Sequence, residues 1–226
     1  MVSISEKKDL VEAKISSEQD RVKFDAVLVA IGITGNSDSI GLEEIGVKTK
    51  LNHIEVDEWC KTNVDGIFAI GDVAAAPWLA HKASHEGVMV ANLIAGKDPI
   101  PVNKISIANC TYSYPEIASI GLTEQQAIDK KININIGNFP LIGNGKAVVL
   151  DDTDGFIKTI YNSETGELLG AHMIGPNVTE LIGSYAIGLG LEITDEDFVH
   201  TILPHPTLSE AIHESALDAL GKAIHI

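Results

Sequence analysis

Residues 155–174 read GFIKTIYNSETGELLGAHMI, in which two alternating apolar stretches flank a polar turn. Strand-forming residues alternate over 155–161 and again over 168–174, while residues 162–166 have the Asn, Ser, Thr and Gly content of a tight turn. The stretch therefore predicts a β-hairpin. Because further strand patterns precede it and helical patterns follow it, we predict an α+β domain, an antiparallel sheet with helices on one face.

The elements around the hairpin are predicted from the same periodicities. Upstream, alternating stretches predict strands at 108–112, 117–121 and 132–139, with a short helix at 123–131 between the last two. Downstream, helical spacing predicts helices at about 178–189, 195–200 and 208–220.

The first part of the chain has a different pattern. Alternating stretches at 10–15 and 22–25 predict two strands around a turn at 16–20. Residues 25–32, DAVLVAIG, form a continuous apolar run, which is typical of a strand buried on both faces of a sheet. A second buried strand is expected at 66–70, so this part predicts an incomplete α/β segment.

Charge and size limit the function. The 226 residues are 45% hydrophobic, enough for one sizeable core or one and a half ordinary domains. Lys+Arg 16 against Asp+Glu 32 gives a net charge of -16. Such a surface repels phosphate backbones and anionic lipids, so we expect no nucleic acid and no membrane partner.

The lack of targeting signals and the small number of cysteines predict a protein of a reducing compartment. No apolar run is long enough for a membrane helix, and residues 1–20 lack the apolar stretch of a signal peptide. Cys60 and Cys110 are the only cysteines and lie too far apart in sequence for a metal pair or a disulfide framework. We expect two buried thiols in a reducing compartment.

The clearest chemical signal is LPHPTLSEA at 203–211. Proline fixes its own φ and keeps the preceding residue out of the helical region, so Pro204 and Pro206 hold His205 in few conformations. Glu210 would lie close by, in the first turn of the following helix. A carboxylate on one ring nitrogen fixes the tautomer and raises the basicity, which suits a general base near neutral pH.

Other roles compete for the same residues. Thr207-x-x-Glu210 is also a capping box, in which Thr207 caps the helix and the glutamate reaches back to a backbone N–H. On spacing alone, the cap is favoured over the histidine–glutamate pair. His213, three residues after Glu210 on the same helix, competes for the carboxylate as well.

A second candidate site follows the strand expected at 66–70. Gly71 would let a ligand approach the backbone, and Asp72 would accept hydrogen bonds from sugar-like hydroxyls at the end of that strand. A helix is predicted next, over 78–95. Gly-Asp is also an ordinary turn, so this signal is weak by itself.

The histidines could also suggest a metal. His81 and His85 are four residues apart on the predicted helix, the spacing of two zinc ligands, but Lys82 stands where a metalloprotease has its glutamate. Glu210-x-x-His213 resembles half of a di-iron site, and no second copy exists. Partly exposed helix histidines explain both patterns, so we expect no metal. The sequence also has no GxGxxG motif.

Several blocks together resemble the dihydrolipoyl dehydrogenases, flavoprotein members of the pyridine-nucleotide disulfide oxidoreductase family. They are TNVDGIFAIGD at 62–72, LAHKASHEG at 79–87 and HPTLSE at 205–210, and LLGAHMIGP at 168–176 is similar to that family's interface domain. The blocks occur in the family's order across nearly the whole chain. Glutathione reductases share the HPT element, whereas the LAHKA block favours the lipoamide branch.

The resemblance implies FAD and NAD as cofactors of the parent enzyme. Gly32, after the first apolar run, would lie near NAD. FAD would meet the glycine–aspartate corner and the backbone at the start of the next helix, at Gly71, Asp72, Trp78, Leu79, Ala80 and His81.

The same resemblance implies the catalytic roles. His205 would be the base that deprotonates dihydrolipoamide and Glu210 its orienting partner, which makes this pair outweigh the capping box. The histidine would act across a two-fold interface on the disulfide of the other subunit, with electrons passing to FAD and then NAD. A dithiol is a poor nucleophile until a base takes its proton. The implied partners are a second copy, in a homodimer, and lipoyl domains of 2-oxoacid dehydrogenase complexes.

The chain also departs from this family. It has no amino-terminal flavin fingerprint, no Cys-x4-Cys disulfide and little of an NAD domain, and Ile33-Thr34-Gly35-Asn36 replaces an arginine-containing turn. We therefore expect the carboxyl-terminal part of such an enzyme, which is inactive alone. FAD and NAD are the cofactors of the parent enzyme, and this part need bind neither of them. It would comprise the end of the NAD-binding domain at 1–32, a returning FAD-domain segment at 33–100 and a dimerisation domain at 101–226.

Two other functions are considered. The chain could serve only as a dimerisation or interaction module with no catalysis of its own, through its apolar helices. A histidine-based metal hydrolase is a third hypothesis, and it predicts stoichiometric zinc. The expected location is the bacterial cytoplasm or the mitochondrial matrix.

Overall fold

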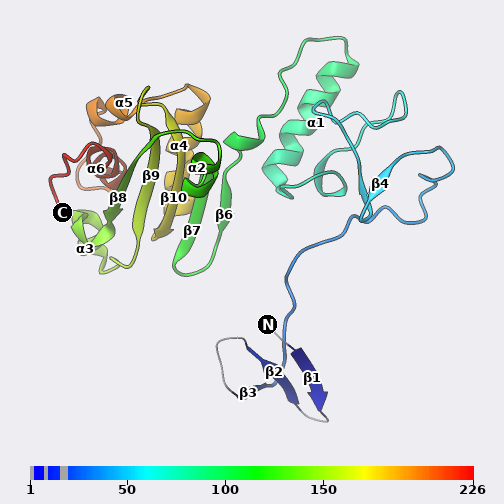
Figure 1. The fold of residues 1–226 in the computed structure, drawn as a ribbon, viewed down its shortest axis with the longest axis horizontal. Coiled ribbons are helices and arrows are strands. Elements are labelled where there is room, and N and C mark those ends of the chain that lie inside the picture. The colour runs from blue at the N-terminus through cyan, green and yellow to red at the C-terminus, as the bar shows by residue number, and fades with distance from the viewer. Residues whose placement is uncertain (1–2, 8–9, 16–19) are drawn as a thin grey trace.

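An antiparallel sheet with packed helices forms the larger part of the molecule (Figure 1). The computed structural model describes residues 3–7, 10–15 and 20–226. The sheet has five strands in the order β6-β7-β10-β9-β8: β6 (Asn109–Thr111), β7 (Glu116–Gly121), β8 (Ile134–Pro140), β9 (Phe156–Asn162) and β10 (Leu168–Gly175). The predicted α+β class is confirmed.

The predicted hairpin is the centre of this sheet. β9 and β10 pair antiparallel, with Ile157 opposite Met173 and Tyr161 opposite Leu168. Residues 162–166 form the turn, where the Asn162 side chain accepts the N–H of Glu164. Asparagine in such a turn replaces a missing backbone partner, which is why this local signal was sufficient to predict the hairpin.

Three helices cover one face of the sheet: α4 (Val178–Gly190), α5 (Asp195–His200) and α6 (Glu210–Ala219). Because side chains alternate along a strand, one row across four strands points to this face, at Ala118, Met173, Ile157 and Phe139. All four are buried in the main core. A fully buried apolar side chain of this size contributes about 1.5–3 kcal/mol.

The short helix α2 (Glu124–Asp129) lies on the opposite face, and in Figure 1 it stands in front of the sheet with α4 behind. Lys158 of β9 forms an ion pair there with Glu124. Thr123 caps α2 in a full capping box with Gln126. The helix α3 (Gly145–Leu150), after the 3-10 turn η3 (Leu141–Gly143), was not predicted.

The first described residues form a separate three-stranded antiparallel sheet of β1 (Ser3–Lys7), β2 (Leu10–Lys14) and β3 (Arg21–Phe24). The strands predicted at 10–15 and 22–25 are thus confirmed as β2 and β3. Most of the turn predicted at 16–20 lies outside the described residues. Figure 1 shows this sheet joined to the rest of the molecule by one extended segment.

The buried strand predicted at 25–32 is wrong. These residues run extended without a strand partner, and Leu28 and Ile31 are 90% and 88% exposed. An apolar run is buried on both faces only where neighbouring strands and helices cover it. No described part of the chain covers this one.

The region at 33–108 has two small buried clusters of its own, one around Leu42, Val47 and Ile54 and one around Cys60 and Met89. It contains β4 (Thr49–Lys50), β5 (His53–Ile54), the 3-10 turns η1 (Gly71–Val73) and η2 (Lys104–Ser106), and the helix α1 (Ala80–Ile94). The helix agrees with the prediction for 78–95. The strand predicted at 66–70 is wrong, because only an isolated bridge from Lys61 to Phe68 forms and Ile70 is partly exposed.

Candidate active site

The histidine between two prolines contacts the carboxylate five residues later. Nδ1 of His205 lies 2.9 Å from Oε1 and 3.2 Å from Oε2 of Glu210. The imidazole is 76% exposed, whereas the carboxylate side chain is 29% exposed. The ring is therefore held by a partly buried acid and remains open to another molecule.

Glu210 also has the backbone role of a capping residue. Its Oε2 accepts the N–H of Thr207 at 2.9 Å, so one carboxylate binds both the backbone and the imidazole. The predicted cap at Thr207 is wrong: its hydroxyl donates to the carbonyl of Pro204, and the helix begins at Glu210 with Ser209 before it. Among the described residues no side chain caps α6, which begins three residues after Thr207, so only the glutamate half of the predicted capping box is present.

Further contacts fix the loop that carries His205. The side chain of Asn144, which is buried, donates to the carbonyl of Thr207 at 3.1 Å. Its Oδ1 accepts the N–H of Ala147, so the same asparagine caps α3. The Asn-Gly sequence before α3 was the only signal that could have indicated this residue.

The electrostatics favour an ionised Glu210. Burial tends to raise its pKa, but the Thr207 N–H, the hydrogen bond and charge of His205 and the charge of His225 lower it, and the net pKa lies below the usual value. An ionised carboxylate only accepts hydrogen bonds, so Nδ1 of His205 is the donor. In the neutral ring, Nε2 then carries the free lone pair.

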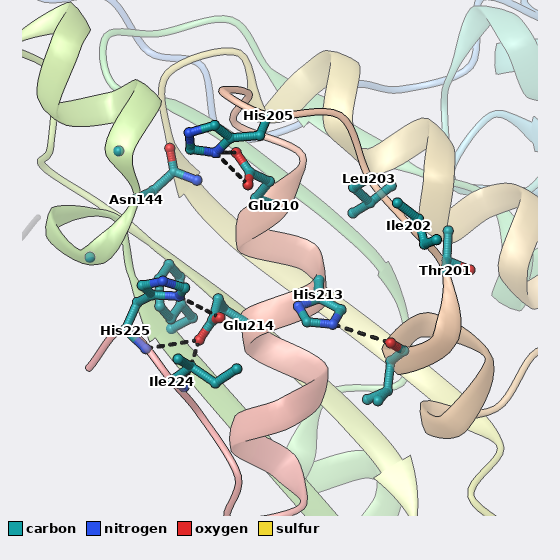
Figure 2. A pocket seen from close by; sticks show the side chains of 14 residues that line it. Asn144, Thr201, Ile202, Leu203, His205, Glu210, His213, Glu214, Ile224 and His225 are labelled. Carbon is teal, nitrogen blue, oxygen red and sulfur yellow. Dashed lines mark hydrogen bonds and ion pairs between the residues drawn. The ribbon is translucent and has the colours of Figure 1, made fainter.

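His213 does not compete for this carboxylate. Its Nε2 lies 3.2 Å from the carbonyl oxygen of Val199, at the end of α5. The expected competition with His205 is wrong, because the His213 ring is turned toward α5 (Figure 2).

A cavity of about 540 Å³ opens beside the pair. Apolar side chains of the segment before α6, Ile202 and Leu203, form part of its lining, together with Glu210 and His205. A second histidine–glutamate pair lines the same cavity: Nδ1 of His225 lies 2.7 Å from Oε1 of Glu214 (Figure 2). No local pattern in the sequence indicates this pair, because His225 follows Glu214 by eleven residues.

The glycine–aspartate corner is held by a buried ion pair. Gly71 has a φ of 71°, a conformation that glycine adopts readily, and its N–H donates to Glu86 Oε2 at 2.9 Å. Glu86 pairs with Lys82 at 3.0 Å, and Lys82 donates to the carbonyl of Ala75 at 2.9 Å. These contacts fix the turn that carries Asp72.

His53 connects the two ends of the next loop. Its Nδ1 lies 3.0 Å from the carbonyl of Asp72, and its ring stacks on Trp78 with centroids 4.8 Å apart. Trp78 also donates to the carbonyl of Ala74. His53 was missed from the sequence because it comes from the distant strand β5.

The chemistry of these residues fits part of a flavin site. The Asp72 carboxylate is exposed, as hydroxyl binding requires, and no side chain in the described part of the chain caps the N-terminus of α1 at Leu79 and Ala80. The first N–H groups of the helix are thus free for ligand oxygens. His81 turns its ring away, with Nε2 2.9 Å from the carbonyl of Ala108, so only its backbone faces this corner.

Gly32 does not form a site with these residues. It is exposed, and a Cβ added there would meet no atom within 4 Å. The described residues therefore do not form an NAD pocket around it. Among the same residues, no group of three or more histidine, cysteine or acidic side chains could hold a metal, and none of the helices described is long and apolar enough to span a bilayer.

The two candidate regions are far apart within one chain. α6 lies at one end of the five-stranded sheet and α1 beyond the other end (Figure 1). His205 and Glu210 therefore cannot share a site with Asp72 and Trp78 of the same copy.

Comparison with known families accounts for both regions. The dimerisation domain of the pyridine nucleotide-disulphide oxidoreductases matches residues 107–216, and a second model, of pyridine nucleotide-disulphide oxidoreductase itself, matches residues 1–87. The chain belongs to the pyridine nucleotide-disulphide oxidoreductase family. This agrees with the family resemblance of the sequence blocks.

Curated relatives within this family are dihydrolipoyl dehydrogenases. The chain is 50% identical to the Zymomonas mobilis enzyme over 95% of its own length and 47% of that enzyme. It is 46% identical to the Rhizobium etli enzyme over 91% of its length and 43% of that enzyme. Among solved structures, LpdA from Mycobacterium tuberculosis matches with a TM-score of 0.84 and 26% identity, over 95% of this chain and 47% of LpdA. The chain thus spans about half the length of the relatives it matches.

Proposed function

We propose that this chain supplies the acid–base pair and the subunit interface of a dihydrolipoyl dehydrogenase. The observation that carries the proposal is the contact of 2.9 Å between His205 Nδ1 and Glu210 Oε1, with the imidazole exposed at a cavity. A fixed carboxylate behind an accessible imidazole sets the tautomer of the ring and suits it to act as a general base.

The proton transfer can be stated at the level of atoms. Nε2 of His205 takes the proton of one dihydrolipoamide thiol, and Glu210 stabilises the resulting imidazolium through Nδ1. The thiolate attacks one sulfur of a disulfide, forming a mixed disulfide as the original S–S bond breaks. The second thiol then completes the exchange, so the substrate is oxidised and the disulfide is reduced.

In this proposal the disulfide lies on a second subunit, in a part of a full-length dihydrolipoyl dehydrogenase that this chain does not span. The only cysteines of the chain, Cys60 and Cys110, are free thiols. Because α6 and α1 lie apart in one copy, a joint site of His205 with the flavin region requires a two-fold partner (Figure 1). The proposed partners are thus a second copy and the lipoyl domains of a 2-oxoacid dehydrogenase complex.

Asp72 and the backbone from Trp78 to His81 would hold FAD, on the donor chemistry described above. Bound there, the flavin would supply a two-electron acceptor between the dithiol and NAD. The NAD contact at Gly32 stays a prediction, as do the domain bounds 1–32, 33–100 and 101–226. We place the protein in the bacterial cytoplasm or the mitochondrial matrix.

A chimera tests the proposal. In it, this chain replaces the matching segment of the Zymomonas mobilis enzyme, to which it is 50% identical over 219 residues. We expect the chimera to reduce NAD with dihydrolipoamide and His205→Gln to lower kcat by about 10²–10⁴-fold, the usual contribution of a general base. His200→Gln is the matched control, since His200 pairs with Glu196 in an exposed contact of the same type.

Full activity of the His205→Gln chimera would contradict the proposal. The 226-residue chain alone, mixed with FAD, NAD and dihydrolipoamide, is expected to form no NADH. NADH formation by the isolated chain would contradict the need for a larger enzyme.

A second candidate function is self-association without catalysis. The matched dimerisation domain favours it, and Tyr112, Tyr114 and Ile202 are large side chains more than four-fifths exposed. Sedimentation of the chain at micromolar concentration should then show twice the monomer mass of 24.1 kDa. A strictly monomeric chain would contradict this function.

A further inference from the structure

Helix α6 presents two carboxylates one turn apart, and each holds an imidazole from outside the helix. Glu210 holds His205 from the segment before α6, and Glu214 holds His225 from the residues after it. Figure 2 shows the two pairs one above the other on the same side of α6. The His205 pair belongs to the proposed base, whereas the second pair has no role in the mechanism above.

The second pair is tightly built. The Glu214 side chain is only 6% exposed and accepts three hydrogen bonds, from the N–H of Ile224 at 3.0 Å, the N–H of His225 at 3.2 Å and Nδ1 of His225 at 2.7 Å. Burial tends to raise the pKa of Glu214, but these donors lower it, and the net pKa lies below the usual value. The contacts fix the chain end against α6 and leave the His225 ring 62% exposed.

Both imidazoles and both carboxylates line one cavity. Its titratable lining groups are His205, Glu210, His213, Glu214 and His225, and the His213 ring is bonded to the Val199 carbonyl. The 3-10 turn η3 and helix α3 contribute only neutral lining groups, Gly143, Asn144 and Gly145. The side chains lining the cavity that can place a positive charge near Glu210 are therefore its histidines, when they are protonated.

Two ionised glutamates at positions i and i+4 of a helix repel each other. A cation held on one of them reduces that repulsion and favours the ionised form of the other. His225 is placed to do this, because Glu214 binds it directly. Its charge is also one of the causes that lower the pKa of Glu210.

We propose that His225, held by Glu214, is a positioning residue for the His205–Glu210 pair: its imidazolium form offsets the repulsion between the two carboxylates, so Glu210 stays ionised to a lower pH and holds the Nδ1–H of His205. Glu210 is ionised above its pKa and loses its charge as the pH falls through that value. Removing the His225 charge raises this pKa, so the pair is lost at a higher pH. The catalytic consequence rests on the proposed function, whereas the electrostatic coupling does not.

The test is an NMR titration of Glu210 in the 226-residue chain, with glutamate labelled at the carboxyl carbon. His225→Asn retains an amide donor toward Glu214 and removes the charge, while His225→Arg keeps a cation. We expect the Glu210 midpoint to rise in His225→Asn, by less than in His205→Gln, and to stay near the wild-type value in His225→Arg. His200→Gln, in the exposed pair with Glu196, should leave it unchanged.

An unchanged Glu210 midpoint in a folded His225→Asn chain would overturn the inference. Equal shifts in His225→Asn and His225→Arg would also overturn it, because they would mean that the tail conformation matters and the charge does not. If His225→Asn does not fold, His225→Gln replaces it as the neutral variant. The titration needs neither dithiol nor flavin, so its failure and that of the proposed function are distinguished by the activity of the chimera.

Discussion

Nζ of Lys82 lies 3.0 Å from Oε1 of Glu86, and both side chains are almost completely buried beneath the Gly71 turn. Burying two charges is costly, and their attraction offsets the cost only while both are present. Lys82→Met leaves Glu86 as an unpaired buried charge, so we expect a loss of about 3–5 kcal/mol of unfolding free energy. Urea denaturation and hydrogen exchange of the Gly71 amide measure it.

The exposed Lys97 provides the control for this prediction, because Lys97→Met removes a charge without uncovering a buried partner. Equal stability of the two variants would show that Lys82 does not compensate Glu86.

Gly137 is where α6 touches the sheet. A Cβ added there would lie 1.8 Å from the carbonyl oxygen of Ser215 and 2.9 Å from the amide nitrogen of Ala219. We expect Gly137→Ala to push α6 away from β8. The unfolding free energy should fall by about 1–3 kcal/mol, the usual range for overpacking. Thermal denaturation measures the loss, and the backbone NMR shifts of Glu210 report the displacement.

Gly145→Ala is the matched control, since a Cβ at Gly145 meets nothing within 4 Å. If both alanine variants were equally stable, the close approach at Gly137 would not limit the packing of α6.

The Glu210 carboxylate should make stability depend on pH. Its folded-state pKa is depressed, so its contribution is present above the pKa of the unfolded chain and is lost as the pH falls through the folded value. Urea midpoints from about pH 7 to about pH 3 should therefore fall less steeply in Glu210→Gln than in the wild type. Glu58→Gln, at an exposed position, should retain the wild-type slope.

The two thiols should react at different rates. Burial, with the nearby Glu86 charge, raises the pKa of the Cys60 thiol to about 11 from 9.0, which lowers the thiolate fraction near neutral pH about 100-fold. Cys60 is also 3% exposed, whereas Cys110 is partly exposed. We expect iodoacetamide to modify Cys110 first, as mass spectrometry of digested protein would show. Equal rates in the native protein, rather than only in urea, would contradict this.

Local patterns predicted the interface domain well. The hairpin at 155–161 and 168–174 is observed as Phe156–Asn162 and Leu168–Gly175, because alternation and turn composition act over neighbouring residues. The helices at 178–189 and 195–200 were found within one residue for the same reason.

Features that depend on distant residues could not be predicted in this way. The apolar run at 25–32 resembles a central strand, but burial requires partners that no local pattern supplies. The contact between His205 and Glu210 could be predicted because only five residues separate them. Glu214 contacts His225 only because the chain folds back along α6. His53 reaches Asp72 and Trp78 across a similar gap.

The hydrogen bonds from the N–H groups of Ile224 and His225 to Glu214 also decide where the protein can be tagged. An affinity tag fused after Ile226 would disturb Ile224 and His225, which line the cavity beside His205. Purification handles, fluorophores and surface attachment belong at the other end of the polypeptide.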